Sequence, residues 1–156
     1  MNANRIAWFE GGVALALLLG ALFFQYALNY PPCEMCHWQR WPHIAASVVG
    51  LGGAILLGLG ILPARAALAV AALATLGVAV SGGLGVFHAG VEYDWWKGPT
   101  ACTTGFVFDG HLDINAPVPH CDHPAWTLFG ISLAGFNAVI SLAAAAFGAI
   151  SLARKP

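Results

Sequence analysis

Four cysteines carry the chemistry that this sequence can perform. Cys33 and Cys36 form a Cys-x-x-Cys within the stretch PPCEMCHWQR, and Cys102 and Cys121 follow later in the chain. A Cys-x-x-Cys can be a redox pair, one half of a zinc site or a structural bridge, because each use needs two thiols that a short turn brings together. The residue types alone leave these three uses open.

The residues around the Cys-x-x-Cys favour redox chemistry. If Pro31 and Pro32 lead into a helix, Cys33 lies in the first turn, where free backbone N–H groups and the helix dipole favour a thiolate. The same helix would place Cys33, Cys36 and Arg40 along one stripe. A guanidinium beside a thiolate stabilises the anion, so this spacing predicts a reactive thiol pair.

A zinc site would need two ligands besides Cys33 and Cys36. Four histidines could supply them: His37, His43, His120 and His123. The spacing of the two later cysteines is unlike that of a zinc site, however, and Cys-rich zinc sites belong mainly to reducing compartments. We therefore expect no metal.

The composition shows which elements must position these cysteines. Of the 156 residues, 59% are hydrophobic and only 8% are charged, far from ordinary globular usage. Four stretches without a charged residue each reach the length of about 18 to 20 residues that crosses a hydrocarbon core. They are residues 11–28, 41–64, 66–87 and 124–153.

The sequence therefore predicts an all-α membrane protein with a four-transmembrane-helix bundle. We expect a single domain over residues 1–156, with helices at about 8–28, 41–62, 66–88 and 125–152. A cleavable signal peptide is the alternative for the first stretch. Gln25 fits the required small residue before a cleavage site poorly, so we interpret the stretch as a retained helix.

The basic residues predict the orientation. Arg5, Arg65, Arg154 and Lys155 lie on one side of a four-helix arrangement, and the positive-inside rule makes that side cytoplasmic. All four cysteines lie on the other side, which in a bacterium is the oxidising periplasm. We predict a multi-pass protein of the bacterial inner membrane with both termini cytoplasmic and the cysteines on the periplasmic face, in contact with membrane lipid and without a nucleic-acid partner.

Two outer loops carry the cysteines. The short loop runs from residue 29 to about 40, and the long one, from about 88 to 123, is rich in Pro, Gly and Asp, so we expect it to be mobile or irregular. Trp95 and Trp96 suit the aromatic belt of the membrane interface. Within the third helix, Gly77, Ser81 and Gly85 recur at four-residue spacing, which favours close helix packing.

The pairing of the cysteines is open at this point, because four cysteines allow three pairings. A purely structural disulfide between Cys102 and Cys121 would stabilise the chain by roughly 3 kcal/mol through loop closure. Two disulfides in so small an outer region would also favour exchange between them.

The sequence resembles the DsbB family of membrane thiol oxidases in the order of its motifs, and over most of its length: PPCEMCHWQRWPH, then GVFHAGVEYDWW, then ACTTG, then CDHPAWTLFGISLAGFN. The resemblance implies a thiol:quinone oxidoreductase that reoxidises a periplasmic DsbA-like partner of the thioredoxin fold. The two electrons would pass to a membrane quinone, ubiquinone or menaquinone. Since DsbA-type oxidants have a potential of about −120 mV, the acceptor must lie higher, as a quinone does.

The resemblance also implies a role for each cysteine. Cys102 and Cys121 would form the disulfide that the partner attacks at Cys102. The released Cys121 would attack Cys33, and Cys36 would remain as a thiolate close to the quinone.

Two further residues are implied to bind the quinone together with Cys36. Arg40 matches an arginine that stabilises the quinone oxygen and the adjacent thiolate, the alternative being that Arg40 extends to a lipid phosphate. His88 matches a histidine near the quinone, the alternative being an interfacial histidine without such a role. Gln39 departs from the acidic residue of the best-known members, which leaves the quinone type and the partner open.

Three other functions are compatible with a small membrane protein that has these cysteines and histidines. His43 and His88 could bind haem, although all the histidines lie near one face. A small structural membrane subunit with inert disulfides is the second alternative, and reduction of a quinone-like vitamin epoxide is the third. The distribution of the cysteines over two loops favours the DsbB-like function.

Overall fold

The computed structural model describes residues 2–99, 102 and 120–154. In this part of the chain, four helices are long and apolar enough to cross a membrane: Ala3–Tyr26, Glu34–Gly58, Ala64–Glu92 and Leu133–Ala153. This confirms the predicted all-α fold of a multi-pass membrane protein. The first span begins earlier than the predicted residue 8, and the third ends later than the predicted residue 88, because these helices continue through Arg5 and Glu92.

Two of the spans contain more than one helical type. The first span is α1 (Ala3–Tyr26) and the fourth is α6 (Leu133–Ala153). The second span runs through α2 (Glu34–Ser47), a π-helical turn (Val48–Gly52) and α3 (Gly53–Gly58). The third begins with a 3-10 turn (Ala64–Ala66) and continues as α4 (Ala67–Glu92).

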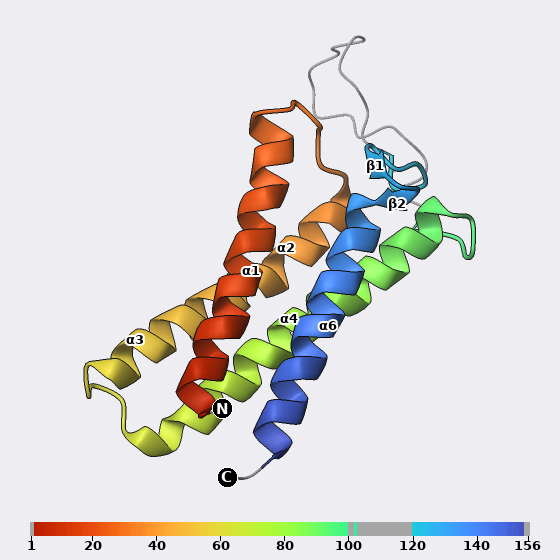
Figure 1. Ribbon diagram of the computed structural model, residues 1–156. Helices are drawn as coiled ribbons and strands as arrows, with labels where there is room; N and C mark the ends of the chain where they lie inside the picture. Colours follow the sequence, from red (N-terminus) through yellow and green to blue (C-terminus); the bar gives the residue numbers. More distant parts are fainter. Residues whose placement is uncertain (1, 100–101, 103–119, 155–156) are drawn as a thin grey trace.

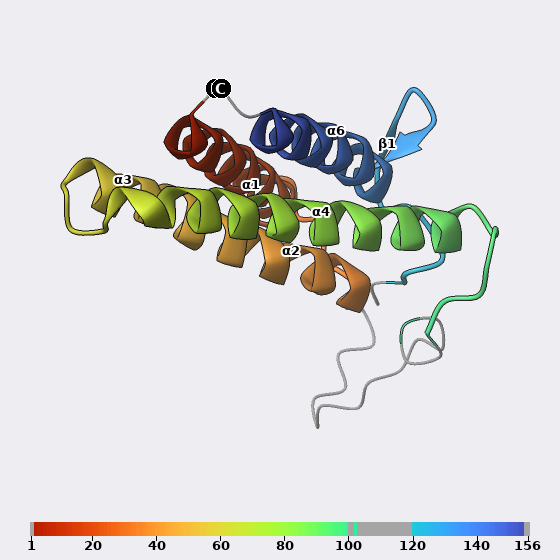
Figure 2. The same ribbon diagram turned by 90° about the horizontal axis from the view of Figure 1, so that it is seen from below.

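Helix α4 is the centre of the bundle. It contacts α2 on one side and α1 and α6 on the other (Figure 2). Both termini lie at one end of the bundle, near the turn between α3 and α4 (Figure 1). The start of α2, the end of α4 and the start of α6 meet at the opposite end, so this end can gather residues from three distant parts of the sequence.

Small residues bring α4 close to its neighbours. A Cβ atom at Gly77 would lie 3.0 Å from the Cβ of Ala46 on α2, and one at Gly85 would lie 2.9 Å from the main-chain nitrogen of Ala138 on α6. Between them, Ser81 donates a 2.8 Å hydrogen bond to a main-chain carbonyl of α2. The predicted packing role of this stripe is therefore confirmed.

The second span begins at Glu34 rather than near residue 41. Cys33 is its N-cap, and the Cys33 Sγ accepts the N–H of Cys36 at 3.2 Å, a role that Ser, Thr, Asp or Asn usually takes. Glu34 and Arg40 lie inside the helix, so a search for uncharged stretches places its start too late. The Cys-x-x-Cys is thus the beginning of a membrane-spanning helix and not part of a free loop.

The fourth span begins at Leu133 rather than near residue 125, because a small hairpin precedes it. Strands β1 (Thr127–Leu128) and β2 (Ile131–Ser132) pair antiparallel. Phe129 and Gly130 form the turn with φ of 52° and 76°, the left-handed pair that a tight two-residue hairpin turn requires. The hairpin leads directly into α6, whose N-cap is Ser132.

The long outer loop is described at its two ends and at Cys102, and the expectation that it is mobile or irregular falls mostly on residues outside the described part of the chain. Trp95 is 67% exposed, and its position at the membrane interface stays a prediction. Trp96 stacks on Phe87 and donates a 2.8 Å hydrogen bond from Nε1 to the Phe87 carbonyl. The loop therefore begins by folding back onto α4.

Candidate active site

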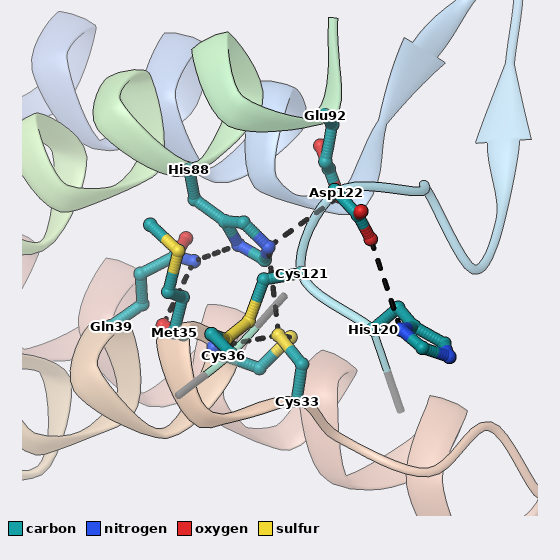
Figure 3. The surroundings of a disulfide bond; sticks show 10 residues. Cys33, Met35, Cys36, Gln39, His88, Glu92, His120, Cys121 and Asp122 are labelled. Atoms are coloured by element: carbon teal, nitrogen blue, oxygen red, sulfur yellow. Dashed lines mark hydrogen bonds and ion pairs between the residues drawn. A yellow bond between two sulfur atoms is a disulfide. The ribbon is translucent and has the colours of Figure 1, made fainter. Parts of the chain in front are cut away.

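The Cys-x-x-Cys lies at the end of the bundle that is opposite the termini. Cys33 Sγ and Cys36 Sγ are 2.8 Å apart and not bonded to each other (Figure 3). Cys33 is only 3% exposed, whereas Cys36 is partly exposed. The two thiols are therefore placed to form a disulfide with little movement, and Cys36 is the more accessible of the two.

The second cysteine pair forms a disulfide. Cys102 and Cys121 are bonded, with Cα atoms 5.5 Å apart, and both are buried. The Cys121 N–H also donates to the Cys102 carbonyl at 3.2 Å. Of the three pairings that the sequence left open, the structure contains this one.

The two cysteine pairs are in contact with each other. Cys33, Cys102 and Cys121 belong to one buried cluster, together with Met35 and Val91. The Cys33 sulfur, the Cys121 sulfur and a ring nitrogen of His88 all lie within 4.8 Å of one another. Thiol–disulfide exchange needs one sulfur to reach another directly, and this arrangement meets that need between Cys121 and Cys33.

The same three ligand atoms would also suit a metal ion by distance alone. The Cys121 sulfur is bonded to Cys102, however, so it has no thiolate to offer. Within the described residues, the cluster consists of one thiol, one imidazole and one disulfide. These groups suit thiol–disulfide exchange.

The surroundings of Cys33 oppose ionisation of its thiol. Its hydrogen bond with the Cys36 thiol and its burial raise the pKa of the Cys33 thiol above the usual range. Between two thiols that share a hydrogen bond, the one that keeps its proton leaves the other as the better thiolate. Cys36, the more exposed residue of the pair, is therefore the candidate for the reactive thiolate.

His88 lies one turn before the end of α4 and contacts the cysteines directly. Its Nε2 is 3.5 Å from Cys33 Sγ and 3.8 Å from Glu92 Oε1. Its Nδ1 is 2.8 Å from Gln39 Nε2 on α2. The side chain is 2% exposed, so His88 is a buried member of the site and not a solvated histidine of the membrane interface.

Arg40 is bound by α1. Its Nη1 donates to Gln25 Oε1 at 2.5 Å, and its Nη2 donates to the Ala21 carbonyl at 3.4 Å. The guanidinium is therefore oriented by the protein, in contrast to the alternative of a side chain that extends to lipid. Arg40 and Cys36 lie one helical turn apart on α2, as the stripe in the sequence predicts.

A cavity of about 560 Å³ adjoins these side chains, between α1, α2 and α6. Cys36, Arg40 and His88 lie in its wall, and apolar side chains such as Leu17, Phe24 and Phe136 form other parts of the wall. A quinone combines a flat ring that carries two acceptor oxygens with an apolar tail. The residues present fit such a molecule, because hydrogen-bond donors and a thiol share one cavity with an apolar surface.

Sequence reasoning missed several polar residues of the site. Gln25 was considered only for the signal-peptide question and Gln39 only as a departure from the family pattern, while Glu92 and Asn137 were not singled out. A signal was present: Gln25 and Asn137 are isolated polar residues in apolar helices, and such residues usually face the interior of the bundle. Which partner each would meet was not readable from the sequence.

Comparisons with known proteins identify the family of this chain. The family model described as disulfide bond formation protein DsbB matches residues 3–151. A disulfide bond formation protein B from Vibrio vulnificus is 29% identical over 148 residues, covering 89% of this chain and 83% of the relative. The protein of the same name from Photobacterium profundum is 30% identical over 148 residues, covering 89% of this chain and 81% of the relative.

A shorter match is closer in sequence. The disulfide bond formation protein B of Burkholderia thailandensis is 39% identical over 77 residues, 49% of this chain and 46% of the relative. No solved structure gives a significant match. The family match over nearly the whole chain, together with two adjoining cysteine pairs at one end of four membrane-spanning helices, shows that the chain belongs to the DsbB family of disulfide bond formation proteins.

Proposed function

We propose that this membrane protein is a thiol:quinone oxidoreductase that generates disulfides for a periplasmic DsbA-like partner. One observation carries the proposal: the Cys102–Cys121 disulfide lies against Cys33, and the Cys33–Cys36 pair lies at a cavity suited to a quinone. Electrons can therefore enter at one cysteine pair and leave at the other without a large movement of the helices.

The first half of the cycle is exchange with the partner. A partner thiolate attacks Cys102, the bond between Cys102 and Cys121 breaks, and Cys121 leaves as a thiolate. The second partner thiol then displaces Cys102, so that the partner is oxidised by two electrons and the protein is reduced by two.

The second half moves these electrons to the Cys33–Cys36 pair. The Cys121 thiolate attacks Cys33 in the Cys33–Cys36 disulfide, and Cys36 leaves as a thiolate. Cys102 then attacks Cys121, which re-forms their disulfide and releases Cys33. The result is a reduced Cys33–Cys36 pair beside an intact second disulfide.

A bound quinone would accept two electrons and two protons, and thereby return Cys33 and Cys36 to the disulfide. In the proposed site, Cys36 supplies the thiolate and Arg40 stabilises negative charge opposite it, with Gln25 holding the guanidinium in place. The apolar part of the cavity excludes water and binds the tail.

The site belongs on the periplasmic face in this proposal. Arg5, Arg65 and Arg154 lie at the end with the two termini, which the positive-inside rule assigns to the cytoplasm of a bacterial inner membrane. The cysteine end then faces the oxidising compartment where a DsbA-like thioredoxin-fold oxidase works.

Oxygen-free stopped-flow absorbance of the purified protein in detergent tests the proposal. With reduced DsbA-like partner and a soluble quinone, we expect one quinone reduced per partner dithiol oxidised. Cys36→Ser should abolish quinone reduction. Cys102→Ser should block oxidation of the partner and leave quinone binding intact, which serves as the matched control for folding. Uncoupled quinone loss, or full turnover of either variant, would contradict the proposed function.

A further inference from the structure

Two buried side chains, Gln39 and His88, and the partly buried Asn137 connect α2, α4 and α6 beside the cysteines. Asn137 Nδ2 lies 2.7 Å from Gln39 Oε1, and Gln39 Nε2 lies 2.8 Å from His88 Nδ1. Gln39 is 7% exposed and His88 is 2% exposed. Figure 3 shows the end of this series of hydrogen bonds, where Gln39 points at Nδ1 of the His88 ring and Cys33 lies at Nε2.

Two main-chain carbonyls fix the direction of these hydrogen bonds. The nitrogen and oxygen of an amide side chain have the same shape, so their positions follow from their partners. Asn137 faces the carbonyl of Ser81 at 3.1 Å, and Gln39 faces the carbonyl of Met35 at 3.3 Å. A carbonyl only accepts, so each amide must present its NH2 group to it.

The carbonyls of Ser81 and Met35 fix the same direction for the hydrogen bonds from Asn137 to His88. With its NH2 toward Ser81, Asn137 donates to the oxygen of Gln39. With its NH2 toward Met35, Gln39 also turns a donor toward His88 Nδ1. If either amide were reversed, an oxygen would face a carbonyl oxygen, which is repulsive. The chain can therefore run in one direction only.

The direction determines which nitrogen of neutral His88 carries the proton. Because Nδ1 receives a donor, it must be the acceptor, and the proton is on Nε2. Nε2 is the nitrogen that lies 3.5 Å from Cys33 Sγ. Cys33 Sγ then receives two donors, the Nε2–H of His88 and the backbone N–H of Cys36 at 3.2 Å.

We propose that Gln39 and Asn137 are positioning residues that lock His88 as a hydrogen-bond donor to Cys33, so that His88 stabilises negative charge on this sulfur and does not remove its proton. The inference rests on the proposed function for the step at which the charge arises. When Cys102 attacks Cys121 in the mixed disulfide, Cys33 leaves as a thiolate, while Cys102 and Cys121 become bonded. The electron pair of the broken bond stays on Cys33, where the Nε2–H meets it.

The surroundings of Cys33 show why such a donor is needed. The Cys36 thiol and burial oppose a thiolate at Cys33, and the Glu92 carboxylate, 3.8 Å from the same His88 nitrogen, adds further negative charge. The sulfur of Cys121 is in a disulfide and carries no charge, while the Cys121 backbone is a further hydrogen-bond partner of the His88 imidazole. Among the described residues, His88 adds a donor to the two groups of Cys36 that contact the leaving sulfur, its backbone N–H and its thiol.

Nitrogen NMR of the full chain in detergent, with 15N-labelled histidine, tests the lock directly. The pattern of two-bond couplings distinguishes an Nε2–H imidazole from an Nδ1–H imidazole, and the His88 signals are assigned by their loss in His88→Asn. We expect neutral His88 with its proton on Nε2 in the wild type. An Nδ1–H form in the wild type would overturn the inference, and this measurement needs neither quinone nor partner.

Variants at position 39 test the cause. Gln39→Glu presents an acceptor to Nδ1, so the His88 proton should move to Nδ1 or both nitrogens should be protonated. Gln39→Leu removes the amide that donates to Nδ1 and should give a mixture of the Nδ1–H and Nε2–H forms of His88. Ser141→Ala is the matched control, because Ser141 donates to the other end of Asn137 at 2.8 Å and does not determine its direction. An unchanged proton position in Gln39→Glu would contradict the proposed lock.

Single-turnover exchange tests the consequence. After mixing with reduced partner and acid quenching, peptide mapping follows the Cys33–Cys121 mixed disulfide. Its lifetime should be roughly tenfold longer in Gln39→Leu, the effect of losing one hydrogen bond to a charged group, and unchanged in Ser141→Ala. A wild-type lifetime in Gln39→Leu would overturn the role of the donor. If the wild-type protein carried the His88 proton on Nε2 but reduced no quinone, only the proposed function would be rejected.

Discussion

At the scale of the residue, the site depends on polar side chains that hold the reactive groups in place. Arg40 is the clearest case: its guanidinium is oriented by Gln25 Oε1 and by the carbonyl of Ala21, both on α1. Neither partner is a reacting group. An arginine side chain has several rotatable bonds, and ordering them when a ligand binds costs conformational entropy. Partners that already fix the side chain before the ligand binds reduce this cost.

We therefore predict that Gln25→Leu raises the apparent KM for quinone by roughly tenfold, the cost of one hydrogen bond to a charged group. The kcat should change less, because Arg40 and both reacting thiols are still present. Steady-state kinetics with a soluble quinone measures both constants. Gln25→Glu keeps an acceptor for Arg40 and should stay close to the wild type. If Gln25→Leu left KM unchanged, Arg40 would not depend on α1 for its orientation.

At the scale of the element, glycines decide how closely the helices approach. Gly11 on α1 meets the π-helical turn of the second span, where an added Cβ would lie 2.7 Å from the main-chain nitrogen of Leu51. The neighbouring Gly12 has no atom within 4 Å of such a Cβ among the described residues. Alanine substitutions at these two neighbouring positions therefore distinguish the effect of helix packing from the effect of helix propensity.

The expected outcome is opposite for the two alanine substitutions. Gly11→Ala should destabilise the bundle by about 1–3 kcal/mol through overpacking against a backbone that cannot move aside. Gly12→Ala should be neutral or stabilising by up to about 1 kcal/mol, since alanine is the better helix former. Thermal unfolding of both variants in the same detergent provides the comparison. Equal stability of the two variants would mean that α1 does not pack as closely as described.

At the scale of the whole molecule, the ends of the bundle differ in chemistry. One end carries both termini and Arg5, Arg65 and Arg154, and the other carries the cysteines. The family and the membrane-spanning helices agree on a multi-pass membrane protein. The charge distribution then predicts which end faces which compartment.

Reporter fusions in a bacterial host check this orientation. A green fluorescent protein fused after Arg154 should fluoresce, because the C-terminal end is expected in the cytoplasm. An alkaline phosphatase inserted after Lys97, beyond the end of α4, should be active, because that end is expected in the periplasm. The reversed pattern at both positions would place the cysteines in the cytoplasm and contradict the proposed function along with the orientation.

Much of the architecture was readable from the sequence because it depends on local properties. The apolar stretches predicted four spans, and the Gly77, Ser81 and Gly85 spacing predicted a packing face. The stripe of Cys33, Cys36 and Arg40 followed from helical periodicity. The starts of the second and fourth spans were placed too late, because Cys33 caps a helix that contains charged residues and a hairpin precedes Leu133.

The sequence by itself thus determined the membrane fold, the end at which the chemistry gathers and the family resemblance, since hydrophobic length, charge and motif order are properties of neighbouring residues. Only the tertiary structure decided that Cys121 lies against Cys33, that Gln25 orients Arg40 and that Asn137 and Gln39 direct His88. Each of these contacts joins different helices or loops. Whether two such residues meet depends on the packing of every helix between them, and no local pattern contains that information.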